Sequence, residues 1–82
     1  MSTHPKALIY RASHRGTKEN DIILGPFAAL EVEGMDEHMR GVFAAFLECP
    51  DEDIYYWVRQ ESQAPEIYTE LVDRIKKFVY KK

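Results

Sequence analysis

The sequence predicts an all-α fold, a compact single-domain bundle of about five short helices across residues 1–82. Apolar residues recur at the three- and four-residue spacing of amphipathic helices, and no segment shows the convincing alternation of a strand. Glycine and proline interrupt this pattern at short intervals, and the connections between helices are too short to divide the chain into domains. A chain of this length has room for one modest hydrophobic core.

The first predicted helix runs from near Pro5 to His14. Thr3 or His4 lies near its cap, and proline in a first turn loses no hydrogen bond because the first N–H groups of a helix have no internal acceptor. Gly16 follows and supplies the backbone freedom that helix ends commonly use. We therefore expect a helix-to-helix turn at this glycine.

The second predicted helix has Thr17 as its N-cap, with Glu19 and Asp21 in the early turns, near the positive end of the helix dipole. Pro26 removes the N–H that would bond the carbonyl four residues earlier, so either a kink at Gly25 and Pro26 or a premature stop is expected. The apolar residues of this helix are Ile22, Ile23, Leu24, Phe27 and Leu30.

The third predicted helix follows a break at Gly34 and ends before Pro50, because the residue that precedes a proline is pushed out of the helical region. Its apolar residues form one stripe at helical spacing. They are Met35, Met39, Val42, Phe43, Phe46 and Leu47.

The fourth predicted helix starts at Pro50 with acidic residues 51–53, and its apolar face carries Ile54, Trp57 and Val58. A loop is expected from Gln60 to Ala64. Pro65 opens the last predicted helix, which has lysines at its C-terminal end, where cations suit the dipole. Helical spacing in this helix relates Ile67, Leu71, Ile75 and Phe78.

Composition and charge exclude several classes of protein. The net charge of −3 and the isoelectric point near 5.5 argue against binding nucleic acid through the whole surface. No apolar run approaches the ~20 residues that span a bilayer, so no stable membrane insertion is expected. A single cysteine, Cys49, and an N-terminus without signal or transit features favour the bacterial cytoplasm. We expect a monomer.

Motifs for catalysis or cofactor binding are not evident. The four glycines never form a phosphate-cradling loop, which argues against a nucleotide or flavin site on this chain. His4, His14 and His38 are scattered and do not pair with Cys49 at metal-ligand spacing. We therefore expect surface histidines, a structural thiol, no metal site and no enzymatic activity of the chain's own.

The segment from Arg15 to Asp21 carries more charge than a turn needs. In one interpretation Gly16 only ends a helix, and Arg15 pairs locally with Glu19. In the other, the bare backbone of Gly16 faces a partner, while Arg15 and Glu19 fix the register and Asp21 supports Arg15 or caps the turn. Tyr55 and Tyr56 leave a similar choice, because they cannot both face inward beside Trp57. They indicate either an interface or a lone exposed ring.

The chain resembles the succinate dehydrogenase assembly factors, small flavinylation proteins of bacteria and mitochondria. Arg15, Gly16 and Glu19 match the family's Arg-Gly-x-x-Glu motif, and the acidic and apolar residues 21–24 continue it. The segment 50–57, Pro-Asp-Glu-Asp-Ile-Tyr-Tyr-Trp, matches a second one. His14, Asn20 and Arg59 depart from the family's usual residues.

The resemblance implies a five-helix protein that binds the flavoprotein subunit of succinate dehydrogenase, with fumarate reductase as a second candidate. It would promote covalent attachment of FAD to a histidine of that subunit, and the FAD would belong to the partner. The predicted partner-binding residues are Arg15, Gly16, Glu19, Asp21, Tyr55 and Tyr56.

Two other classes are considered. The first is an antitoxin-like or general adaptor that binds a different protein, with membrane-associated proteins included among the candidates. The second is a helix-turn-helix regulator of DNA. It is disfavoured because the negative charges of Glu19 and Asp21 offset the positive charge of the nearby basic residues.

Overall fold

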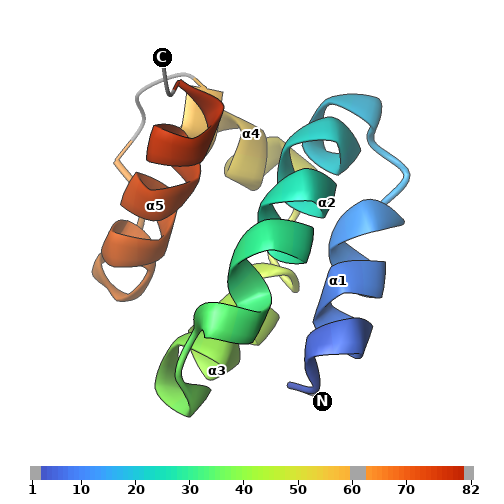
Figure 1. The fold of residues 1–82 in the computed structure, drawn as a ribbon. Coiled ribbons are helices and arrows are strands. Elements are labelled where there is room, and N and C mark those ends of the chain that lie inside the picture. Colours follow the sequence, from blue (N-terminus) through green and yellow to red (C-terminus); the bar gives the residue numbers. More distant parts are fainter. Residues whose placement is uncertain (1–2, 60–62, 81–82) are drawn as a thin grey trace.

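A computed structural model describes residues 3–59 and 63–80 and confirms the all-α prediction. Within this part of the chain, all regular structure is helical (Figure 1). The elements are α1 (Pro5–Ser13), α2 (Lys18–Glu31), the 3₁₀ turn η1 (Val32–Gly34), α3 (Glu37–Phe46), α4 (Asp51–Arg59), the 3₁₀ turn η2 (Glu66–Tyr68) and α5 (Thr69–Val79).

The long helix α2 is central to the arrangement. It packs against α1, α4 and α5. Figure 1 shows α1 beside α2, with α5 on the opposite side of α2 and the α1–α2 turn at the top of the molecule. The short connection between α1 and α2 forces the two helices to run antiparallel, as short helix–helix connections do.

The hydrophobic core is built around three buried phenylalanines. The ring of Phe27 on α2 lies edge-on to Phe43 of α3, with centroids 5.9 Å apart, and to Phe78 of α5 at 5.8 Å. Phe46 packs against the half-buried Trp57 and Tyr68. These contacts join α2, α3, α4 and α5 into a single core, the one core that the length of the chain allows.

Caps fix the starts of two helices. The His4 ring accepts a hydrogen bond from the backbone N–H of Lys6 at 3.1 Å, which settles the choice between Thr3 and His4. The Asp36 carboxylate accepts from the N–H of Met39 at 2.8 Å and begins α3. Met35 therefore precedes this helix, although it is buried as its place in the apolar stripe predicts.

Pro26 does not stop α2. The helix continues through the proline to Glu31, so the premature stop was wrong. Proline removes one hydrogen bond, but Leu24 and Phe27 on either side of it are completely buried. Packing of this face holds the backbone helical, since most helical stability in proteins comes from tertiary contacts.

The start of the last helix differs from its prediction. Pro65 precedes the short turn η2, and α5 begins only at Thr69. A 3₁₀ turn has three residues per turn instead of 3.6, so it shifts the register of the side chains that precede α5. Ile67 is 63% exposed instead of facing the core, and Tyr68 packs inward in its place.

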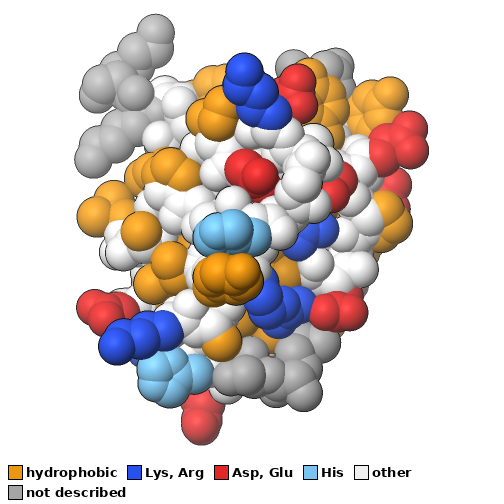
Figure 2. Space-filling model, turned by 90° about the vertical axis from the view of Figure 1, so that its right-hand side faces the viewer, with side chains coloured by type: hydrophobic (Ala, Val, Ile, Leu, Met, Phe, Trp, Pro, Cys, Tyr) orange, Lys and Arg blue, Asp and Glu red, His pale blue; other side chains and the backbone are white. Residues whose placement is uncertain are grey.

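Residues 60–62 of the predicted loop and Lys81 and Lys82 lie outside the described residues. Among those that are described, no helix has both the length and the apolar character needed to cross a membrane. On the face seen from the α1 side, hydrophobic, acidic and basic side chains are interspersed (Figure 2). This face therefore has no continuous basic patch for nucleic acid.

Candidate functional site

The turn between α1 and α2 is open to solvent at Gly16. Its backbone has a φ of +92°, in the left-handed region that glycine adopts without strain. A Cβ placed on Gly16 would meet no atom within 4 Å beyond its two neighbours in the chain. The glycine is therefore required by the backbone conformation and not by internal crowding, and its outer side is accessible to another molecule.

Asp21 holds this turn against the first turn of α2. Its carboxylate accepts a hydrogen bond from the backbone N–H of Arg15 at 3.0 Å. The backbone N–H of Asp21 in turn donates to the carbonyl of Thr17 at 2.8 Å. This contact is to the backbone of Arg15 and not to its side chain, so Asp21 caps the turn and supports Arg15 through the same bond.

The Arg15 side chain reaches across to the end of α3 and the start of α4. Its guanidinium donates to the carbonyls of Leu47 at 2.7 Å and Cys49 at 2.9 Å, and it forms an ion pair with Asp51 at 2.5 Å. Carbonyls at a helix C-terminus lack internal partners, and a planar fork with five donors can bond several at once. The side chain is only 10% exposed.

These contacts correct the sequence analysis on Arg15. The ion pair joins Arg15 to Asp51, 36 residues away, so the local pair with Glu19 was wrong. The guanidinium of Arg15 already binds groups of the chain itself. We therefore revise the role of Arg15 from contacting a partner to positioning the Gly16 turn on α4.

Asn20 is a second positioning residue, one that the sequence analysis noted only as a departure from the family pattern. It is 1% exposed, and its side-chain amide donates to the backbone carbonyl of Asp51 at 2.9 Å and to its carboxylate at 3.1 Å. A signal was present in the sequence. Asn20 lies three and four residues before Ile23 and Leu24, and thus on the face of α2 that is buried.

Arg11 makes a parallel contact one turn earlier along α1. Its guanidinium pairs with Glu48 at 2.6 Å and donates to the carbonyl of Ala44 at 3.4 Å. Arg11 and Arg15 thus both bind the C-terminal end of α3. Sequence reasoning missed this contact, because nothing local indicates a partner 37 residues away.

The environment of Asp51 lowers the pKa of its carboxyl below the ordinary value of 3.8. Burial alone raises this pKa, but hydrogen bonds from Arg15, Asn20 and Thr17 favour the charged form and together outweigh it. Asp51 is therefore ionised at neutral pH and contributes to stability as an anion.

We expect Asp51→Asn to lower the free energy of unfolding by about 1 kcal/mol at neutral pH, because the charge-assisted bonds weaken. A lowered pKa stabilises the fold above the unfolded value, and this contribution is lost as pH falls through the folded value. The difference from wild type should therefore begin to shrink below about pH 4 and close only as the pH falls through the lower folded pKa. Urea titrations at pH 7 and pH 3 measure it, and a pH-independent difference would contradict this role.

A groove of about 410 Å³ lies beside the Gly16 turn, and we call it the acidic groove. Glu19 is exposed, Tyr56 is 45% exposed, and the rings of Tyr55 and Tyr56 are 6.1 Å apart. The groove brings the two sequence motifs together, since its walls come from the start of α2 and the start of α4. Its lining residues are Thr17, Glu19, Asp51, Glu52, Tyr55 and Tyr56.

The two tyrosines beside an open glycine turn are a feature that protein interfaces favour, and the three carboxylates give the groove a negative charge. The fold is that of a small helical protein, and this surface is its candidate docking site. A family model described as "Flavinator of succinate dehydrogenase" matches residues 6–79, and the chain belongs to this family.

Individual relatives agree with the family model. The mitochondrial succinate dehydrogenase assembly factor 2 of Dictyostelium discoideum is 36% identical over 61 residues, covering 74% of this chain and 43% of that protein. The Cryptococcus neoformans protein of the same name is 38% identical over 85% of this chain and 41% of its own length. The FAD assembly factor SdhE of Yersinia pestis is 34% identical over 83% and 80%. The chain thus spans less than half of these two eukaryotic relatives.

Proposed function

We propose that this chain binds the flavoprotein subunit of succinate dehydrogenase and promotes the covalent attachment of FAD to that subunit. The observation that carries the proposal is the open backbone of Gly16 next to the acidic groove. The family membership supports the choice of partner. The chain acts as an accessory protein in this scheme, and the FAD belongs to the partner.

The residues of the surface divide into contacting and positioning groups. Gly16 allows a close approach of the partner's backbone. Glu19 and the exposed Tyr56 offer a carboxylate and an aromatic face, which together suit an arginine or lysine of the flavoprotein. Arg15 and Asp21 keep the turn in place. The partner element that enters the acidic groove is therefore basic.

Docking promotes flavinylation through a shift in population. The covalent bond forms when a histidine of the partner and the flavin ring are held in reactive geometry. A protein that binds this arrangement more tightly than the alternatives raises its population. About 1.4 kcal/mol of differential binding gives tenfold more of the competent state while that state is rare. The chain needs no reactive group of its own for this role.

Three further points belong to the proposal. We place the fumarate reductase flavoprotein as a second client, because the same docking chemistry suits a related subunit. We also place the chain in the bacterial cytoplasm as a monomer. The relatives include a mitochondrial protein of Dictyostelium discoideum and a bacterial protein of Yersinia pestis, and the proposal takes the bacterial case.

Binding to the purified flavoprotein subunit tests the docking surface. Neutralisation by Glu19→Gln should weaken the complex about tenfold, since it removes one charge of an interface pair. Glu33→Gln is a matched control, because Glu33 is also exposed but lies in η1, outside the acidic groove. Isothermal calorimetry gives both dissociation constants.

Equal affinities of Glu19→Gln and wild type would rule out the acidic groove as the docking surface. Failure of the wild-type chain to bind the subunit at all would favour the adaptor alternative.

A further inference from the structure

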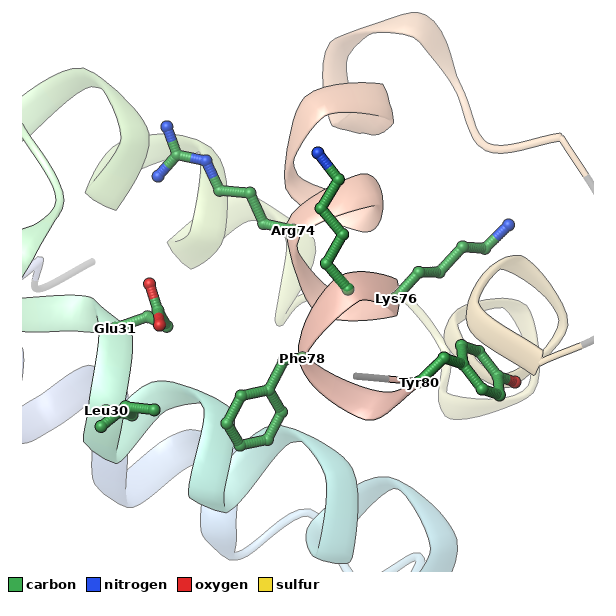
Figure 3. Close-up of a pocket in the computed structure, with 7 residues that line it drawn as sticks. Leu30, Glu31, Arg74, Lys76, Phe78 and Tyr80 are labelled. Carbon is green, nitrogen blue, oxygen red and sulfur yellow. The ribbon is translucent and has the colours of Figure 1, made fainter. Parts of the chain in front are cut away.

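A second groove, of about 830 Å³, lies between the C-terminal half of α2 and α5 (Figure 3). We call it the basic groove. Arg74 and Phe78 extend from α5 toward the side on which Leu30 and Glu31 lie, whereas Lys76 and Tyr80 project to the other side of α5. Its lining residues are Leu30, Glu31, Arg74, Lys76, Lys77, Phe78 and Tyr80.

The groove combines an apolar floor with a cationic rim. Leu30 is 68% exposed, and the half-buried Phe78 connects the groove to the core through its contact with Phe27. Its lining includes Arg74 and Lys77 with one carboxylate, that of Glu31, and a third cation, Lys76, on the other side of α5. The net charge of the chain is −3. An apolar surface with this rim complements a segment that carries both an apolar side chain and acidic residues.

Helix termini alone do not account for these residues. Lysines in the last turn of α5 suit its dipole, but Arg74 lies in the middle of that helix and Leu30 belongs to α2. The ion pair between Arg74 and Glu70 is at the surface, with side chains 43% and 67% exposed. Such a pair is weak, so Arg74 can exchange it for a partner's carboxylate.

We propose that the basic groove is a second docking surface, which takes an acidic segment of the flavoprotein with one large apolar side chain. This inference rests on the proposed function. The apolar side chain covers Leu30 and Phe78, and the carboxylates face Arg74 and Lys77. The carboxylate of Glu31 among the lining residues repels a uniformly anionic membrane surface, which favours a protein segment.

The two grooves together set the orientation of the complex. The acidic groove lies at the start of α2 and the basic groove near its end, and 14 helical residues span about 20 Å. A large partner can therefore contact both. Docking in the reverse orientation would bring like charges together, which disfavours it strongly.

The test measures affinity for the purified flavoprotein subunit at several salt concentrations. Leu30→Asp should weaken binding at least about tenfold, because it removes the apolar contact and adds a repelling charge. Lys77→Glu should weaken binding, slow association and reduce the salt dependence. Ile67→Asp and Lys6→Glu are matched controls, with exposed side chains outside both grooves, and should bind like wild type. Circular dichroism checks the fold of each variant.

Wild-type affinity in both groove variants would overturn the second docking surface while leaving the proposed function intact. In that case Gly16→Arg should still lose binding, which would show that the acidic groove side docks without the basic groove. Absence of binding by the wild-type chain would instead be a failure of the proposed function. A second experiment measures co-sedimentation of the chain with phosphatidylglycerol vesicles. If Leu30→Asp and Lys77→Glu abolish binding to the vesicles and leave binding to the flavoprotein unchanged, the basic groove is a membrane contact and the inference is wrong.

Discussion

Replacing Gly16 by arginine is expected to abolish binding to the flavoprotein while the helical fold survives. Beyond its neighbours in the chain, a Cβ at this position meets no atom within 4 Å, so the fold has room for the new side chain, which would occupy the space that the partner's backbone needs at Gly16. The φ of +92° makes any other residue strained, at a cost of about 1–2 kcal/mol. The affinity should fall more than about 100-fold, or ~2.7 kcal/mol.

Two control variants separate strain from bulk. Gly16→Ala shares the backbone strain and adds one methyl group, so it should lose similar stability and much less affinity. Gly41→Arg places the same side chain at another open glycine, on α3, and should bind normally. Circular dichroism and calorimetry measure the two effects. Unfolding of Gly16→Arg would show that the glycine serves only the fold.

Arg15→Lys is expected to lower both stability and affinity. The guanidinium bonds two carbonyls and the Asp51 carboxylate, and a single ammonium cannot take all three directions. Loss of these bonds in a side chain that is 10% exposed should cost about 2–3 kcal/mol of unfolding free energy. Affinity falls because α4, which carries Tyr55 and Tyr56, is no longer held against the Gly16 turn.

Arg74→Lys is the matched control for stability alone, because its ion pair with Glu70 lies at the surface and should change the free energy of unfolding by less than about 0.5 kcal/mol. It is not a control for binding, since Arg74 lines the basic groove. Denaturant titration measures unfolding and calorimetry measures binding. If Arg15→Lys kept full stability and lost only affinity, the guanidinium would be a direct contact and its positioning role would be wrong.

Much of the fold could be predicted because helical periodicity and caps are local signals. Asp36 and the apolar stripe of α3 lie within a few residues of one another, as do His4 and Pro5 at the start of α1. Prediction failed at Ile67, where a 3₁₀ turn changed the register before α5. No local pattern marks that change, because it depends on how α5 reaches the core.

The site was predictable in part, for the same physical reason. The Gly16 turn and the support from Asp21 follow from residues close in sequence. The contacts of Arg15 and Asn20 with Asp51 join residues 36 and 31 positions apart, and only the packed helices bring them together. An arginine within a charged turn could not be distinguished by sequence from one that faces a partner.

The central claim is that docking through the Gly16 turn and the acidic groove promotes covalent flavinylation. In-gel flavin fluorescence of the flavoprotein subunit, incubated with FAD and with or without an equimolar amount of this chain, tests it most directly. We expect a strong increase in covalent flavin with the wild-type chain and none above background with Gly16→Arg. Equal fluorescence in all three samples would contradict the account.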